Sequence, residues 1–151
     1  MSTLNQDEKK RVPIREGLFT IPLSPLEQVS LIGSKCRNCG EVSLSTVSSC
    51  PNCAGEDLEV IPLSQRGRLW TYTVIRHRPP GDYRVPDPFI PFGEGLVELA
   101  EGIRVKSPID GDVDRLKIGT ELGLVVYKLY ENEEGNDVIA FKFKPVQEGL
   151  S

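Results

Sequence analysis

Two pairs of cysteines constrain the fold of this chain more than any other feature of its sequence. Cys36 and Cys39 form one C-x-x-C motif, Cys50 and Cys53 form a second, and 10 residues separate the two motifs. Two such motifs, each on a tight turn, place four sulfur atoms around one tetrahedral metal ion. A shell of four thiolates has no open position for water or substrate. We therefore expect a structural metal, with zinc as the first choice and iron in a rubredoxin-like site as the alternative.

The surrounding sequence favours a metal over a disulfide. Gly40 can take the left-handed conformation that closes a metal-binding turn, and Pro51 presets the second turn. The start of the chain lacks the apolar core of a signal peptide, and no apolar run approaches the roughly 18 residues of a membrane helix. We therefore expect a cytoplasmic protein with no membrane partner, in which cysteines stay reduced or bind metal.

An apolar segment, residues 18–35, lies directly before the first cysteine motif. Ser24 is suited to cap a short helix that begins at Pro25, with Glu27 in its first turn. We expect this helix to dock its apolar face on the core of this chain or on a partner. An N-terminal arm with this docking helix forms the first expected unit, residues 1–33, and the four-cysteine zinc ribbon forms the second, residues 34–62.

The remaining residues, 63–151, carry the pattern of a barrel built from strands. Trp70, Tyr72 and Val74 alternate with other residues and are expected on one face of the first strand, which covers residues 68–76. Further strands are expected, with turn signals between them, at residues 96–100, 103–105, 121–130 and 138–144. Five strands and few helices indicate a mainly β fold. A five-stranded OB-fold barrel is the preferred architecture, and a Greek-key sandwich is the alternative.

A proline-rich loop, residues 78–93, and a group of arginines are the candidate binding features. Five prolines exclude this loop from a central strand, and long ordered loops often carry function. Its aromatic side chains are candidates for contact with a ligand or partner, or alternatively cap the barrel: Tyr83, Phe89 and Phe92. Arginine suits phosphate recognition, although a solvated strand face also explains such charges. The candidate arginines are Arg66, Arg68, Arg76, Arg78 and Arg84.

No motif in the sequence marks a catalytic centre. His77 is the one histidine of the chain, and no nucleophile or carboxylate partner for it is marked by a motif. The chain of 151 residues carries a net charge of −4, which argues against wholesale binding to a nucleic-acid backbone. We therefore expect no catalytic residues in this chain, and we do not expect nucleic acid as its partner.

Several short segments of the sequence, in this order along the chain, resemble those of a known protein family. LIGSKCRNCG leads into the ribbon, GRLWTYTV begins the barrel, LVELAEGIR forms a hairpin, LKIG precedes the long strand and FKP closes the barrel. Over about residues 18–146 the chain resembles the family of rubredoxin-like zinc-ribbon/OB-fold proteins associated with acyl-CoA. It departs from many relatives at residues 42–49, where VSLSTVSS replaces an aromatic residue and prolines. This departure concerns the outer surface of the ribbon and not the metal.

The resemblance implies an accessory subunit that is not catalytic alone. Family members usually accompany a thiolase-fold enzyme, and that large subunit supplies the nucleophilic cysteine and the acid/base histidines. A chain of this size is similar to the small subunit of two-subunit thiolases of the benzoylsuccinyl-CoA type, which act in the degradation of aromatic compounds. The resemblance thus implies structural zinc, a thiolase-fold large subunit as partner and acyl-CoA as ligand of the complex. The alternative is a single-stranded nucleic-acid-binding protein, since ribbons and OB barrels also serve that role.

Overall fold

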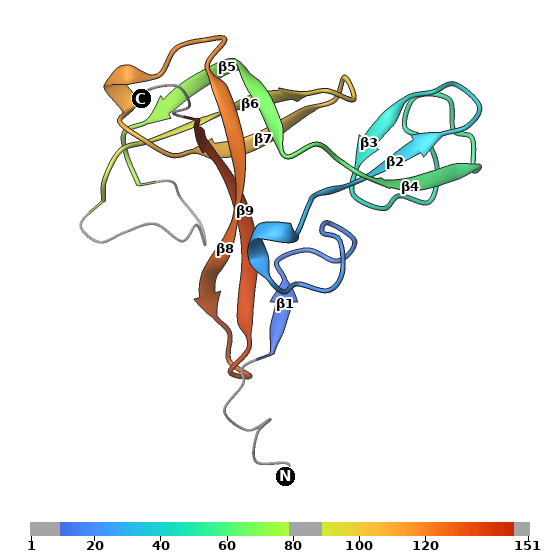
Figure 1. The fold of residues 1–151 in the computed structure, drawn as a ribbon, viewed down its shortest axis with the longest axis horizontal. Coiled ribbons are helices and arrows are strands. Elements are labelled where there is room, and N and C mark those ends of the chain that lie inside the picture. The colour runs from blue at the N-terminus through green and yellow to red at the C-terminus, as the bar shows by residue number, and fades with distance from the viewer. Residues whose placement is uncertain (1–9, 79–88, 147–151) are drawn as a thin grey trace.

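The computed structural model describes residues 10–78 and 89–146 and consists of a small sheet beside a larger barrel (Figure 1). The small sheet carries the cysteines and has the strand order β3-β2-β4, with antiparallel pairing on both sides of β2. Its strands are β2 (Ile32–Cys36), β3 (Val42–Leu44) and β4 (Leu58–Pro62). We call this part the ribbon.

The barrel is a ring of five strands, which confirms the mainly β fold and the predicted strand number. Its members are β5 (Arg66–Ile75), β6 (Phe92–Leu99), β7 (Arg104–Ile109), β8 (Glu121–Glu131) and β9 (Asp137–Pro145). Neighbours follow in the order β5-β6-β7-β9-β8, and β8 pairs again with β5 to close the ring. All pairs are antiparallel except β7 with β9. A short strand, β1 (Arg11–Pro13), adds to β9 from outside in parallel, and a 3-10 turn, η2 (Val113–Arg115), lies between β7 and β8.

The barrel core follows from the two-residue period of its strands. On β6 the buried positions alternate with half-buried ones, so that Gly95, Val97 and Leu99 point inward. The largest fully buried side chain is Phe143 of β9. Gly95 leaves room for a close approach of β5, because a Cβ there would lie 2.5 Å from the carbonyl oxygen of Thr71. Inward-facing side chains therefore fill the barrel, and the absence of a side chain at Gly95 allows β5 and β6 to approach closely.

One prediction about β5 is wrong, because this strand contains a bulge. The pairing with β6 shifts between Leu69 and Thr71, which leaves Trp70 as the extra residue. Trp70 is consequently exposed, whereas Tyr72 packs against the core and its hydroxyl donates to the carbonyl of Leu116 at 3.0 Å. Trp70 and Tyr72 therefore do not share a face, since an extra residue inverts the alternation on either side of it.

The predicted N-terminal docking helix is also wrong. The described residues contain no α-helix, and the segment after Pro25 forms a single 3-10 turn, η1 (Leu26–Gln28), without a side-chain cap. The backbone instead pairs across the segment, where the Ile32 N–H donates to the Leu18 carbonyl and the Thr20 N–H to the Ser30 carbonyl. This extended path buries a set of apolar side chains that one helix face could not bury together: Leu18, Phe19, Leu23, Val29 and Leu31. Within the described residues no helix is long and apolar enough to cross a membrane.

The ribbon and the barrel are joined by a fixed connection. Leu63 is buried, its N–H donates to the carbonyl of Leu31, and its side chain lies against Gly33. The next residue, Ser64, donates from its N–H and its hydroxyl to the Glu101 carboxylate at 3.0 and 2.9 Å. Glu101 belongs to the turn between β6 and β7, so the barrel itself orients the chain that leaves the ribbon.

Candidate metal centre and ligand-facing surfaces

The four cysteines predicted as metal ligands converge in the ribbon. Their Sγ atoms all lie within 4.8 Å of one another. The Cys36 and Cys53 sulfurs are 3.6 Å apart, and the Cys39 and Cys50 sulfurs are 3.7 Å apart. Four sulfurs at about 2.3 Å from a zinc ion in a tetrahedron are about 3.8 Å apart, so the donor set fits zinc. The structure holds these sulfurs where a structural metal needs them.

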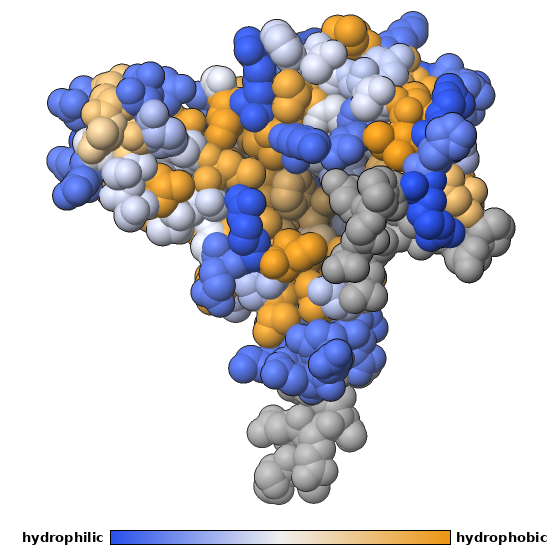
Figure 2. All heavy atoms as spheres, turned by 180° about the vertical axis from the view of Figure 1, so that it is seen from behind, coloured by the Kyte–Doolittle hydropathy of each residue, from blue (hydrophilic) through white to orange (hydrophobic). Residues whose placement is uncertain are grey.

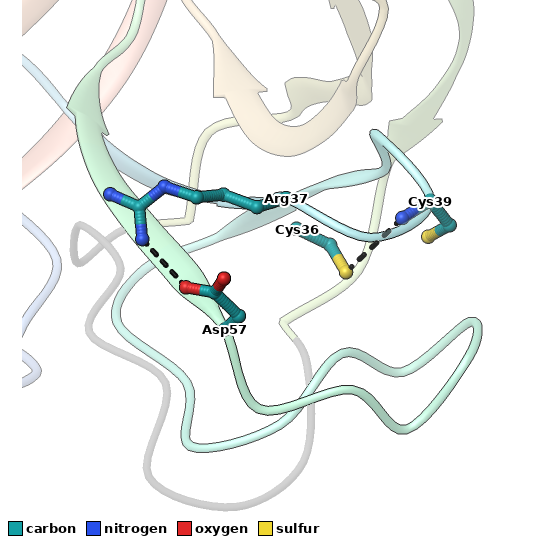
Figure 3. A network of polar contacts seen from close by, with 4 residues as sticks. All are labelled: Cys36, Arg37, Cys39 and Asp57. Atoms are coloured by element: carbon teal, nitrogen blue, oxygen red, sulfur yellow. Dashed lines mark hydrogen bonds and ion pairs between the residues drawn. The ribbon is translucent and has the colours of Figure 1, made fainter.

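Two similar turns carry the ligands. In the first turn the Cys39 N–H donates to Cys36 Sγ at 3.5 Å (Figure 3), and the Gly40 N–H donates to the Cys36 carbonyl at 2.8 Å. In the second turn the Asn52 N–H donates to Cys50 Sγ at 3.3 Å, and the residue after Cys53, Ala54, donates to the Cys50 carbonyl at 2.8 Å. Gly40 has a φ of 83°, the left-handed conformation expected of it. Ala54 adopts the same region, at 65°, without being a glycine.

Two asparagine side chains also reach the sulfurs. Asn38 Nδ2 lies 3.5 Å from Cys53 Sγ, and Asn52 Nδ2 lies 3.5 Å from Cys39 Sγ. A donor beside a sulfur stabilises the thiolate, so the hydrogen bond from Asn38 is the main cause that lowers the pKa of the Cys53 thiol to about 6. The hydrogen bond from Asn52 likewise lowers the pKa of Cys39. The exposed thiols of Cys39 and Cys53 therefore lose their protons more readily than an ordinary thiol, and the thiolate is the form that binds metal.

The structure divides the candidate arginines into two groups at opposite ends of β5. Arg66 and Arg68 are exposed at its start, and Arg66 pairs with Glu121 at 3.2 Å. Arg76 and Arg78 are exposed just beyond its end. At about 3.3 Å per residue, eight residues of strand separate Arg68 from Arg76 by up to about 26 Å, so the two groups do not form one cluster. Arg84 lies outside the described residues.

The described aromatic residues of the proline-rich loop lie beside an apolar groove. Phe89 and Phe92 meet edge to face with ring centroids 6.1 Å apart, and Tyr83 lies outside the described residues. The apolar groove has a volume of about 610 Å³, and its lining includes Ile14, Ile90, Phe92, Tyr127, Leu129 and Phe141. In the view of Figure 2, apolar side chains gather in a central hollow of the surface, in keeping with this lining. The groove thus presents a mainly apolar lining at the surface of the barrel.

Charged and aromatic residues at the edge of the apolar groove were not predicted from the sequence as candidates for a binding site. Tyr127 of β8 is half buried, and burial raises the pKa of its phenol. Lys142 of β9 lies 4.7 Å from the centre of the Tyr127 ring and 3.1 Å from an Asp110 carboxylate oxygen. Alternation on β8 and β9 marks these residues only as strand residues. Their meeting depends on the register between the two strands, for which the sequence carries no local signal.

A second surface feature arises from the β-bulge. The guanidinium carbon of Arg104 lies 3.9 Å from the centre of the exposed Trp70 ring, and Arg104 also pairs with Glu98 at 3.5 Å. Trp70 was expected in a strand, but Arg104 was expected only as part of a hairpin. The contact reaches from β5 to β7 over the intervening strand β6, and it places a large amphipathic group on the outer face of the barrel.

The fold and the metal centre define the class of this chain, a rubredoxin-like zinc ribbon followed by an OB-fold barrel. Family models match both parts, the "ChsH2, rubredoxin-like zinc ribbon domain" at residues 24–59 and the "ChsH2, C-terminal OB-fold domain" at residues 60–126. The chain belongs to the ChsH2/DUF35 family.

Relatives with known names align along most of the chain. A "DUF35 domain-containing scaffold protein" of Methanothermobacter thermautotrophicus is 38% identical over 124 residues, which cover 79% of this chain and 89% of that protein. The "Benzoylsuccinyl-CoA thiolase subunit BbsA" of Thauera aromatica is 29% identical over 123 residues, 77% of this chain and 76% of that one. A solved structure titled "Ltp2-ChsH2(DUF35) aldolase" shares the fold, with a TM-score of 0.59 and 24% identity over 77% of this chain and 84% of that chain.

Proposed function

We propose that this chain is a non-catalytic accessory subunit that docks on a thiolase-fold acyl-CoA enzyme. The alignment with proteins named scaffold or thiolase subunit, over about three quarters or more of both chains, carries the proposal. The finer assignment is the small subunit of a thiolase of the benzoylsuccinyl-CoA type, acting in the degradation of aromatic compounds. In such a complex the ribbon is a rigid platform for docking and the barrel lies near the entrance of the acyl-CoA site.

The chemistry of the described residues supports a role without catalysis. All four cysteines of the chain converge in one cluster that could hold a metal ion, so in this proposal their sulfurs are ligands rather than nucleophiles. A metal held by four thiolates has no position for a substrate. His77 is exposed just beyond the end of β5. The nucleophile and the bases of the reaction therefore belong to the partner in this proposal.

The surfaces at the end of β5 support a part in binding acyl-CoA. CoA combines an anionic diphosphate nucleotide with a long pantetheine arm that leads to the acyl group. Arg76 and Arg78 offer guanidinium groups to the phosphates, and the nearby apolar groove with Phe92 offers space to the arm or to the acyl group. Arg66 and Arg68, at the other end of the strand, form a second and separate candidate for the phosphates. Phe89 and Phe92 are the described candidates for contact with the arm or with the partner.

Calorimetric titration of acyl-CoA into the complex, purified with its native partner, tests these assignments. Replacing Arg76 and Arg78 together by alanine is expected to weaken binding about tenfold or more, because hydrogen bonds to charged groups are each worth about 1.5–3 kcal/mol. The double replacement of Arg66 and Arg68 tests the second group. The control is Arg37→Ala, which removes an exposed ion pair on the ribbon.

Unchanged affinity in both double variants would remove the arginines from the site. Partner-free protein that binds single-stranded nucleic acid at physiological salt would favour the alternative function instead.

A further inference from the structure

The two cysteine motifs share one residue besides their cysteines. They read Cys36-Arg37-Asn38-Cys39 and Cys50-Pro51-Asn52-Cys53, so that an asparagine precedes the second cysteine in each. In the structure each asparagine side chain reaches the other motif. The Asn38 amide lies 3.5 Å from the sulfur of Cys53, and the Asn52 amide lies 3.5 Å from the sulfur of Cys39. The contacts are reciprocal and join the two turns across the metal site.

The sulfurs reached by these side chains are the ones that solvent also reaches. Cys36 and Cys50 are buried, and each accepts a hydrogen bond from a backbone N–H of its own turn. Cys39 and Cys53 are exposed. The backbone supplies donors to the two inner sulfurs. The asparagine side chains add donors to the two outer sulfurs, beside backbone hydrogen bonds from Glu41 to Cys39 and from Gly55 to Cys53.

We propose that Asn38 and Asn52 form a reciprocal amide clamp that retains the metal. A divalent ion with four thiolates carries a net charge of −2, and N–H donors directed at the sulfurs offset part of that charge. Partners that hydrogen-bond to metal ligands fix their orientation and raise metal affinity. Each asparagine also links its own turn to a sulfur of the opposite turn, so loss of the metal requires both turns to separate. This inference does not depend on the proposed function, because it concerns the isolated chain.

The full-length chain with either asparagine replaced tests the clamp. Asn38→Asp and Asn52→Asp keep the shape of the side chain but place a carboxylate oxygen where the donor was, next to a thiolate. Asn38→Ala and Asn52→Ala remove the donor without adding charge. Arg37→Ala is the matched control, since Arg37 lies in the same turn and its guanidinium pairs with Asp57 at 2.7 Å (Figure 3).

Two readouts separate the clamp from a role in folding alone. Competition for zinc with a chromophoric chelator is expected to show a 10- to 100-fold loss of affinity in the double Ala variant, and a larger loss in the double Asp variant. In cobalt-loaded protein the sulfur-to-metal charge-transfer band is expected to move to lower energy in the single Ala variants, because a thiolate that has lost a donor holds its electrons less tightly.

Each outcome bears on the clamp. Zinc affinity and charge-transfer energy equal to those of Arg37→Ala in all Asn variants would overturn it. If the Asp variants take up no cobalt, the Ala variants decide: an unshifted band would overturn the clamp, and a shifted band would support it.

Discussion

Removal of the metal is expected to unfold the ribbon and leave the barrel folded. Within residues 34–62 the buried side chains are Ser34, Cys36, Ser45 and Cys50, and none of them is aliphatic or aromatic. The ribbon therefore has almost no hydrophobic core of its own. Binding of a structural zinc contributes about 10–16 kcal/mol in small zinc domains. That is as large as the roughly 5–15 kcal/mol that stabilises a whole domain, so the ribbon without its metal has no comparable source of stability. The core around Phe143 has no buried member within residues 34–62, although the half-buried Val42, Leu44 and Ile61 pack against it.

Hydrogen–deuterium exchange read by mass spectrometry measures both parts in one sample. After chelation, the amides that close the cysteine turns, such as that of Gly40, are expected to exchange at the rate of an unfolded chain. The amides of β6, β8 and β9 are expected to keep their protection. Cys50→Ser should reproduce the map of the chelated protein, and Ser49→Ala, at an exposed neighbouring position, should reproduce that of the metal-loaded protein. Protected ribbon amides in a sample that elemental analysis finds free of metal would refute the reasoning.

Two further predictions concern the barrel. Gly95→Ala is expected to destabilise the protein by about 1–3 kcal/mol in chemical denaturation, because its Cβ would lie 2.5 Å from the Thr71 carbonyl. Gly123→Ala, whose Cβ would come no closer than 3.4 Å to a neighbour, is the control, and an equal loss in both variants would contradict the steric argument. Lys142→Met is expected to raise the pKa of Tyr127 further above its ordinary value, since Lys142 favours the phenolate that burial disfavours. Ultraviolet titration of the phenol measures this shift, and a fall in the pKa would contradict it.

The parts of the account that the sequence predicted are those set by local patterns. The spacing of four cysteines specifies a metal site, because each pair needs only its own turn to present two sulfurs. The alternation of apolar residues after Arg66 locates strands because it, too, depends only on residues that are close in sequence. The predictions failed where contacts between residues distant in sequence determine the local structure. The segment containing Pro25 pairs with itself and packs on the barrel instead of forming a helix, and the bulge at Trp70 depends on its pairing with β6.

The candidate site shows the same division. The cysteine ligands could be assigned from spacing, whereas the reach of Asn38 and Asn52 to the opposite turns depends on how the two turns face each other. The arginines looked like one group because they are close in sequence, but an extended strand separates residues by its length. Arg66 and Arg76 therefore lie at opposite ends of β5.

Purification of the tagged chain from the cells that produce it, followed by native mass spectrometry, tests the central claim most directly. We expect a stoichiometric complex with a thiolase-fold protein that carries its own active-site cysteine, and we expect each copy of this chain to retain one metal ion. Recovery of the chain alone under conditions that keep its metal bound, or in complex with nucleic acid, would contradict the role of accessory subunit.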